Sequence, residues 1–385
     1  MASEQKRPQQ NAGRSLPAAC RTCRILRQIA AGQRLQIINY LIIIIAALIT
    51  IVTLVCLLSK TPGKTFYFFF FGPFRNIYNF GNLMNNAVPL ILGGLGVSIA
   101  MKTGNLNLGG EGQVYSGAFV STITALYLTG ILPELRFFTG IISVCTGAFF
   151  SGAIAALSGL FKAKWKTNEL ITSFLFSNTI ILIVNYFING PFHDPYTNLQ
   201  STKKIAENLR LPQILPPSNL SATLIIAIAA VIIVGFFLKE TKLGYEFRMA
   251  GINEMFARYG GINTGRNTVL AMFYSGAMYG LAGALSVFGT YYSAINGFSS
   301  GFGWNGLAAA LIAGFNPTAV LPASLFFSWI ISGAKTAMQN SDITFEIAMV
   351  VQSVIFFLAT SAFLVSSKQG SLFNRLTAAG KESNE

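Results

Sequence analysis

The sequence predicts an all-α polytopic membrane protein, and its composition and apolar runs support this prediction. Hydrophobic residues make up 52% of the 385-residue chain and charged residues only 10%, whereas soluble domains carry about 25% charged residues. Apolar runs of roughly 20 residues, enough for one helix to cross a bilayer, recur along the chain. The net charge of +14 lies mainly in tails and short loops. This pattern fits a membrane protein with basic cytoplasmic loops, and we expect no nucleic-acid partner.

About ten transmembrane helices are expected, with broken or re-entrant segments and a two-fold internal pseudo-repeat. The runs that predict the helices are 37–58, 82–101, 113–132, 137–161, 170–188, 222–238, 269–292, 306–315, 319–338 and 347–365. The run 306–315 is the shortest of them. The aromatic stretch 60–80 is broken by Gly72 and Pro73, so we interpret it as an interfacial or re-entrant piece and not as a span.

The distribution of basic residues predicts the domain organisation and the orientation. Residues 1–36 form a basic tail, residues 37–365 the transmembrane domain, and residues 366–385 a C-terminal tail. Both tails should be cytoplasmic because Lys and Arg concentrate there and in the loop 239–266. The proline-rich stretch 189–220 is expected to be an external loop. In the N-terminal tail, Cys20 and Cys23 lack the further ligands that a zinc site needs, so no metal site is predicted.

Enzymatic chemistry finds no support in the sequence. The GxGxxG string at Gly301 lies in apolar membrane sequence without the strand and acidic residue of a dinucleotide site. Gly63-Lys64-Thr65 lacks the first glycine of a P-loop, since Leu58 stands in its place. With one histidine, His193, and no close pair of carboxylates, no catalytic residues are predicted. A transporter or channel remains, and we expect it to bind no cofactor.

The charged loop 239–266 separates two blocks of apolar sequence and predicts a short amphipathic helix. Ile252, Met255, Phe256 and Tyr259 fall at i, i+3, i+4 and i+7 and so share one helix face. Asn253 should cap its start, and Gly260-Gly261 should end it. So short a helix needs a cover for its apolar face. Either lipid headgroups or a soluble partner could supply that cover.

Two glycine-rich, polar segments interrupt the apolar sequence in the two halves of the chain. Such breaks in corresponding halves are typical of repeat-built transporters, whose pathway lies between the repeats. The candidate pathway residues are Asn105, Asn107, Glu111, Gln113, Trp304 and Asn305. Two alternatives remain at this stage: Glu111 could face water in a cytoplasmic turn, and Trp304 could be an interfacial anchor.

Four motifs, taken together and in order, resemble the permease subunits of bacterial ABC importers for nucleosides and simple sugars, the branched-chain amino acid/ribose permease-like family. They are GNLNLGGEGQ (104–113), TNELITSFLFSN (167–178), GYEFRMAGINEMFARYGGIN (244–263) and GFGWNGLAAALIAGFNP (301–317). The resemblance implies that the loop 239–266 holds the helix that couples to an ATP-binding subunit. The contact residues would be Glu246, Arg248, Gly251, Asn253, Met255, Phe256 and Arg258.

The resemblance also implies the partners and the place of the protein. ATP and magnesium would bind to a separate ATP-binding cassette subunit, a second permease subunit would complete the pathway, and an external lipoprotein would deliver the solute. The chain would lie among the lipids of the bacterial inner membrane. The predicted function is ATP-driven import of a nucleoside-like solute such as a purine nucleoside, riboflavin or a simple sugar. A self-sufficient secondary carrier or channel is the alternative.

Overall fold

The computed structural model describes residues 59–131 and 135–342, with single positions between 45 and 57 and between 344 and 357. The predicted spans 37–58 and 347–365 and both tails lie largely or wholly outside these residues. The described part is helical, and its β-bridges are isolated pairs, such as the one between Gln213 and Ser221. The expectation of an all-α polytopic membrane protein is therefore confirmed.

Seven described helices are long and apolar enough to cross a membrane, and they correspond to seven of the predicted runs. They are α3 (Ile77–Met101), α4 (Gly110–Ile131), α5 (Arg136–Trp165), α6 (Glu169–Asn189), α7 (Thr223–Glu240), α10 (Thr264–Ser286) and α12 (Pro317–Asn340). A π-helical turn, Val287–Tyr291, extends α10. The aromatic stretch before α3 forms a short helix, α2 (Pro62–Phe70), as expected of a piece that does not cross.

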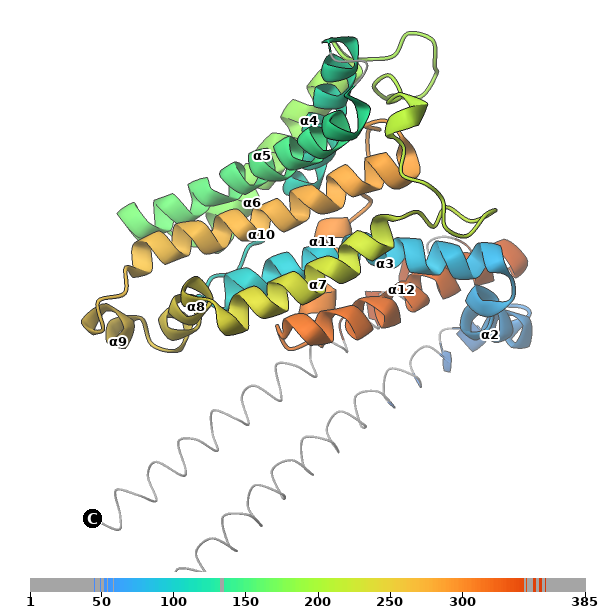
Figure 1. The fold of residues 1–385 in the computed structure, drawn as a ribbon. Coiled ribbons are helices and arrows are strands. Elements are labelled where there is room, and N and C mark those ends of the chain that lie inside the picture. The colour runs from blue at the N-terminus through green and yellow to red at the C-terminus, as the bar shows by residue number, and fades with distance from the viewer. Residues whose placement is uncertain are drawn as a thin grey trace, which may run out of the picture.

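Helix α3 is the centre of the bundle. Its apolar side chains point in all directions, a pattern typical of a helix surrounded by other helices, and Leu92 and Leu95 are fully buried. In Figure 1, α4, α5, α6 and α10 lie on one side of the molecule, and α7 and α12 lie beside α3. Outer helices such as α6 and α7 expose Leu182 and Ile232. These outward apolar faces suit contact with lipid.

The run 306–315 does not form a full span, and this prediction was wrong. Helix α11 begins at Phe302 and ends at Ile312, so its 11 residues extend over about 16 Å, whereas a bilayer core is about 30 Å thick. The preceding segment 292–301 is not helical, because Tyr292, Gly297, Ser300 and Gly301 all have positive φ angles. The segment and α11 together take the place of one long helix.

A second non-helical segment, residues 102–109, separates α3 from α4, as the glycines in that stretch predict. The start of α4 and the start of α11 meet inside the bundle: a Cβ atom added at Gly303 would lie 2.2 Å from the backbone nitrogen of Glu111. Both contact α10, where Tyr279 packs against Gly110 and donates a hydrogen bond to the carbonyl of Gly303 at 3.2 Å. Each half thus contains a long helix, a non-helical segment and a helix that starts inside the protein.

The charged loop and the proline-rich loop lie at opposite ends of α3. Near its C-terminal end, Gly251 packs against the carbonyl of Lys102. Near its N-terminal end, the side chain of Asn82 accepts a hydrogen bond from the backbone of Asn219 at 3.1 Å. The charged loop forms two helices, α8 (Lys242–Ile252) and α9 (Glu254–Tyr259), visible at the left of Figure 1. We call these two ends of the bundle the α9 end and the α2 end.

Candidate functional site

The polar residues of the 102–109 segment are packed inside the protein. The Asn107 side chain is 1% exposed, and its amide nitrogen donates hydrogen bonds to Gln113 at 2.8 Å and to Ser275 of α10 at 3.0 Å. Asn105 is equally buried and donates to the hydroxyl of Thr103 at 2.6 Å. A helix break at membrane depth needs such internal partners. These side chains therefore hold the break in shape rather than line an open channel in this conformation.

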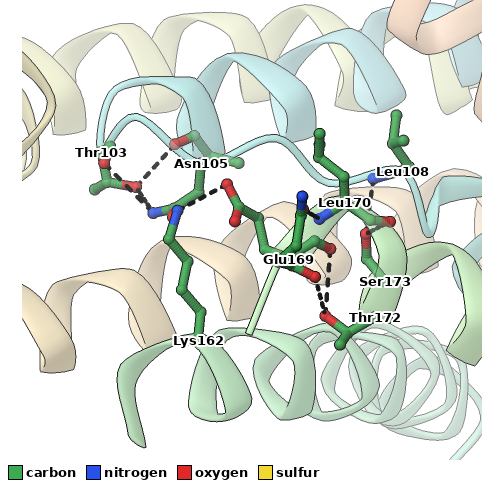
Figure 2. A network of polar contacts seen from close by, with 10 residues as sticks. Thr103, Asn105, Leu108, Lys162, Glu169, Leu170, Thr172 and Ser173 are labelled. Atoms are coloured by element: carbon green, nitrogen blue, oxygen red, sulfur yellow. Dashed lines mark hydrogen bonds and ion pairs between the residues drawn. The ribbon is translucent and has the colours of Figure 1, made fainter. Parts of the chain in front are cut away.

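Helix α6 supports the same segment from the other side, as Figure 2 shows. The hydroxyl of Ser173 accepts a hydrogen bond from the backbone of Leu108 at 3.1 Å (Figure 2). One turn further along α6, Ser177 accepts a hydrogen bond from the backbone of Gly112 at 2.8 Å. The two serines lie four residues apart on one face of α6. Of the two amides that they bind, Leu108 belongs to the non-helical segment and Gly112 to the first turn of α4. A Cβ at Gly112 would lie 2.5 Å from the carbonyl oxygen of Ser177, so only glycine allows this approach.

The corner between α5 and α6 orients those serines. The Asn168 side chain caps the start of α6 by accepting from the backbone of Leu170 at 2.9 Å. Lys162 near the end of α5 forms an ion pair with Glu169 at 2.7 Å, and the two side chains point toward each other in Figure 2. The sequence alone assigns no role to the residues of the motif 167–178. The structure shows that it braces the glycine-rich motif 104–113.

Glu111 joins the two broken segments. One carboxylate oxygen accepts hydrogen bonds from the Ser299 hydroxyl at 2.5 Å and the Gly301 backbone at 3.0 Å, and the other accepts from the Gly303 backbone at 2.8 Å. These backbone amides belong to the start of α11, where unpaired N–H groups and the helix dipole favour a negative charge. Glu111 therefore caps a helix from another part of the chain, and the interpretation of a turn facing water does not describe it.

Trp304 and Asn305 lie on the first turn of α11 but do not join the Asn107 cluster. The Trp304 side chain is 42% exposed, and its ring lies 6.2 Å from that of Phe174 on α6, centroid to centroid. Asn305 is half-buried, and its backbone N–H bonds to the carbonyl of Gly301. The six candidate pathway residues thus fall into three places. Asn105, Asn107 and Gln113 are buried, Glu111 caps α11, and Trp304 and Asn305 lie on an outward-facing turn.

A cavity of about 270 Å³ lies nearer the α2 end, between α3, α10 and α12. Four asparagines of α3 line it, namely Asn79, Asn82, Asn85 and Asn86. Asn82 lies three residues from Asn79 and Asn85 and four from Asn86, a spacing that places all four on one helix face. This face was not predicted, because the residues stand at the start of an apolar run, although their spacing was a signal that could have revealed it. Among the described residues that line the cavity, Lys335 is the one with a formal charge.

At the α9 end, most of the predicted coupling residues hold the corner together. Arg248 donates to the carbonyls of Leu238 and Lys239 at the end of α7. Glu246 accepts from Asn267 of α10 at 3.2 Å. A Cβ at Gly251 would lie 2.3 Å from the carbonyl oxygen of Lys102. Each of these three residues therefore fixes α8 to a membrane helix.

Helix α9 is attached to α10 by its polar residues and leaves its apolar face bare. The Asn253 side chain caps α9 by accepting from the backbone of Phe256 at 3.0 Å, and Gly260 ends it, as predicted. Arg258 pairs with Glu254 at 2.7 Å and donates to Thr264 at 3.0 Å. The apolar side chains of α9, Met255, Phe256 and Tyr259, are each at least 63% exposed. The prediction that Ile252 shares their helix face was wrong, because Asn253 is extended and Ile252 ends α8.

Lys102, directly after the C-terminal end of α3, places a positive charge close to the corner formed by α8 and α9. Burial, and then the charge of Arg248, lowers the pKa of Lys102. Among the described residues, no group of three or more His, Cys, Asp or Glu side chains could hold a metal ion.

Comparison with known proteins identifies the family. Residues 79–360 match the family described as branched-chain amino acid transport system / permease component. The chain is 31% identical to the probable riboflavin import permease protein RfuC of Treponema pallidum, over 85% of this chain and 86% of the relative. It is 29% identical to the guanosine ABC transporter permease protein NupP of Bacillus subtilis, over 78% and 86%.

A third relative extends the range of solutes to sugars. The glucose ABC transporter permease protein TsgB13 of Haloferax volcanii is 28% identical over 83% of this chain and 86% of its own length. A second guanosine permease protein of B. subtilis, NupQ, is also similar to this chain. No solved structure gives a significant match.

Both the ordered motifs and the matched length point to one conclusion. A permease subunit forms the membrane pathway of an ABC importer, and the ATP-hydrolysing site of such a system lies in a separate subunit, so the chain is a transport subunit and not an enzyme. Seven apolar helices of spanning length agree with a multi-pass membrane protein. The chain belongs to the branched-chain amino acid transport system / permease component family.

Proposed function

We propose that this chain imports a nucleoside-like solute, a purine nucleoside, riboflavin or a simple sugar, with energy from ATP hydrolysis on a partner. The relatives named for riboflavin, guanosine and glucose support this range of solutes. The observation that carries the proposal is the bare apolar face of α9, where Met255 and Phe256 are 65% and 63% exposed. That face suits a groove on a soluble ATP-binding cassette subunit, since an apolar helix face is a common element of protein recognition.

The corner that carries α9 is fixed by contacts to several membrane helices, as a coupling element needs to be. Arg248, Glu246 and Gly251 fix α8 to α7, α10 and the end of α3, and the Arg258–Glu254 pair fixes α9 to the start of α10. If the ATPase displaces α9, the movement would therefore be transmitted to the membrane helices and would not be absorbed by deformation of a loop. In this role Met255 and Phe256 contact the partner, and Glu246, Arg248, Gly251, Asn253 and Arg258 hold the contact in place.

We place the pathway beside the two non-helical segments inside the bundle, residues 102–109 and 292–301. Asn105, Asn107, Glu111 and Gln113 shape the start of α4, and Trp304 and Asn305 lie at the start of α11, so a change in the contact between these two helix ends would open or close the region beside them. We place the α9 end in the cytoplasm and the α2 end, with the loop 189–220 and the asparagine-lined cavity, outside. The binding lipoprotein would dock at the α2 end.

A second permease subunit belongs to the proposal. The guanosine relatives NupP and NupQ of B. subtilis are two different permease proteins that both resemble this chain. Exposed apolar side chains on the outer helices provide surface for such a subunit as well as for lipid.

Uptake by the purified complex tests the proposal. The chain is purified in mild detergent with everything that binds to it, reconstituted in vesicles containing ATP, and assayed with radioactive guanosine, riboflavin and ribose. ATP-dependent uptake of one of them, together with a co-purified ATP-binding protein, is expected. Uptake that continues without ATP, or a chain that purifies alone, would overturn the proposal and favour a secondary carrier.

The variant Phe256→Asp sharpens the test. It places a charge on the bare face of α9 and should abolish both co-purification of the ATPase and uptake. Phe256→Leu is the matched control, because leucine keeps the exposed face of α9 apolar at the same position. Full ATP-driven uptake by Phe256→Asp would show that α9 does not couple.

A further inference from the structure

We infer that the asparagine-lined cavity is an entry site that admits neutral or anionic solutes rich in hydrogen-bond acceptors and rejects cations, with Lys335 as the residue that sets this selectivity. The inference rests on the proposed function, because it assigns the solute class of the same transporter.

The cavity is built for a small polar molecule. Its volume of about 270 Å³ is close to the lower end of small-molecule sites, about 300 Å³. Tyr78, Tyr291 and Phe302 contribute aromatic surface to its wall. Aromatic side chains stack on flat heterocyclic rings. A planar ring with polar edges therefore fits the lining better than a flexible aliphatic solute.

The unpaired hydrogen-bonding groups of the cavity include strong donors. Asn85 and Asn86 use their amide nitrogens on Thr290 at 3.1 Å and on Ser332 at 3.3 Å. Asn82 accepts from the backbone of Asn219, while its amide nitrogen and the Lys335 ammonium have no partner among the described residues. A ligand that offers carbonyl or ring-nitrogen acceptors can pair with both groups.

The charge of Lys335 is not compensated within the described lining. No carboxylate is present among the lining residues that the structure describes, and no ion pair of Lys335 occurs in this part of the chain. Lys335 is on α12, five positions before the helix ends at Asn340, so it lies at the side of the cavity nearer the α2 end. An isolated positive charge next to a low-dielectric wall raises the local concentration of anions and lowers that of cations.

The starting residue of α11 joins this cavity to the Glu111 cap. Phe302 lines the cavity, and the next residue, Gly303, donates its backbone N–H to Glu111. A solute in the cavity would therefore contact the start of α11, where the two broken segments meet. This link gives the entry site a route to the pathway.

Thiol labelling measures the charge of the cavity independently of transport. Ser332 is replaced by cysteine in a chain whose Cys20, Cys23, Cys56 and Cys145 are serine, within the assembled transporter in right-side-out membrane vesicles. The rates of reaction with an anionic and a cationic methanethiosulfonate reagent are then compared. Residues 332 and 335 are neighbours on one helix face, so Lys335→Gln should lower the anionic-to-cationic rate ratio by at least about fivefold.

Matched variants separate the local charge from other effects. Lys335→Arg keeps the charge and should keep the ratio. Lys64→Gln removes an exposed lysine of α2 at the same end of the bundle, outside the cavity, and should leave the ratio unchanged. Thr290→Cys provides a second probe in the cavity wall, on the π-helical turn that extends α10, where the same result is expected. An unchanged ratio in Lys335→Gln at both probes, or a cavity that neither reagent reaches, would overturn the inference.

Competition extends the test to solutes. Adenosine and the cationic 1-methyladenosine differ by one charged methylation, so the first should inhibit uptake more strongly than the second, and Lys335→Gln should reduce this difference. Equal inhibition of the unaltered transporter by the two compounds would overturn the inference even if the labelling ratio responds. If no uptake occurs with any solute while the labelling ratio responds to Lys335, the proposed function fails and the charge of the cavity stands.

Discussion

A carboxylate oxygen of Glu111 accepts a hydrogen bond of 2.8 Å from the backbone N–H of Gly303, although 192 positions separate the two residues. This contact joins the helix that follows the first break to the helix that follows the second. Because α11 starts inside the bundle, its first backbone amides would otherwise be unpaired in an apolar environment. The cap thus supplies acceptors for the backbone amides that the second break leaves unpaired.

Removing the charge at this cap should weaken it. In Glu111→Gln, the amide nitrogen meets a backbone donor at one of the two oxygen positions, so a buried donor loses its partner. We expect the complex to lose about 1–3 kcal/mol of stability and to transport more slowly. The measurement is thermal unfolding of the detergent-purified complex together with uptake. Glu207→Gln is the control, because the Glu207 side chain is 88% exposed; equal behaviour of both variants would argue against the cap.

The close approach at Gly303 should tolerate no side chain. In Gly303→Ala, the new Cβ would lie 2.2 Å from the backbone nitrogen of Glu111, and such overpacking costs about 1–3 kcal/mol or more. The same substitution at Gly130 meets nothing within 4 Å and should be neutral or slightly stabilising in its helix. Expression level and melting temperature of the two variants provide the comparison. Equal melting temperatures would show that α4 and α11 do not meet so closely.

The serines of α6 should contribute to the stability of the complex through their hydrogen bonds to the backbone of residues 108 and 112. Ser177→Ala leaves the buried backbone N–H of Gly112 without its acceptor, which should cost about 1–3 kcal/mol. Thr179→Val is a suitable control, since Thr179 bonds only within its own helix and faces outward. Melting temperatures of the purified complex check the prediction. It fails if Ser177→Ala melts within a degree or so of the control.

Asp342 should make the attachment of α2 sensitive to acid. Hydrogen bonds from the Ser59 hydroxyl and the Lys60 backbone lower the pKa of Asp342 from 3.8 to about 2. Because the folded state lowers this pKa, the contact is at full strength above about pH 4 and is lost as the pH falls toward 2. The difference in melting temperature between the unaltered complex and Asp342→Asn should be constant from pH 8 to pH 5 and shrink below pH 4. A difference that changes between pH 8 and pH 5 would contradict this assignment.

Much of the architecture could be predicted from sequence because bilayer thickness dictates helix length. The seven long helices follow from apolar runs, and the break after α3 follows from its glycines. The cap at Asn253 and the end at Gly260 follow from local rules of helix termination. The span at 306–315 was wrong because hydropathy does not reveal that Gly301 and its neighbours keep the chain non-helical up to Phe302.

The candidate site was harder to predict, since it depends on contacts between distant segments. Nothing local in the sequence shows that Arg248 and Glu246 bond to α7 and α10, or that Glu111 pairs with α11. The asparagine face of α3 is different, because its helical spacing is local information. It was overlooked because apolar length dominates the interpretation of a membrane sequence.

The bare face of α9 also affects how the cell handles unassembled subunits. If α9 docks on a cytoplasmic ATPase as proposed, a chain made in excess of that subunit would present Met255, Phe256 and Tyr259 to the cytosol. Exposed apolar side chains of this kind favour aggregation and recognition by chaperones and proteases. We therefore expect the half-life of the permease in the cell to depend on the supply of its partner, so that subunit stoichiometry is corrected by degradation of the excess.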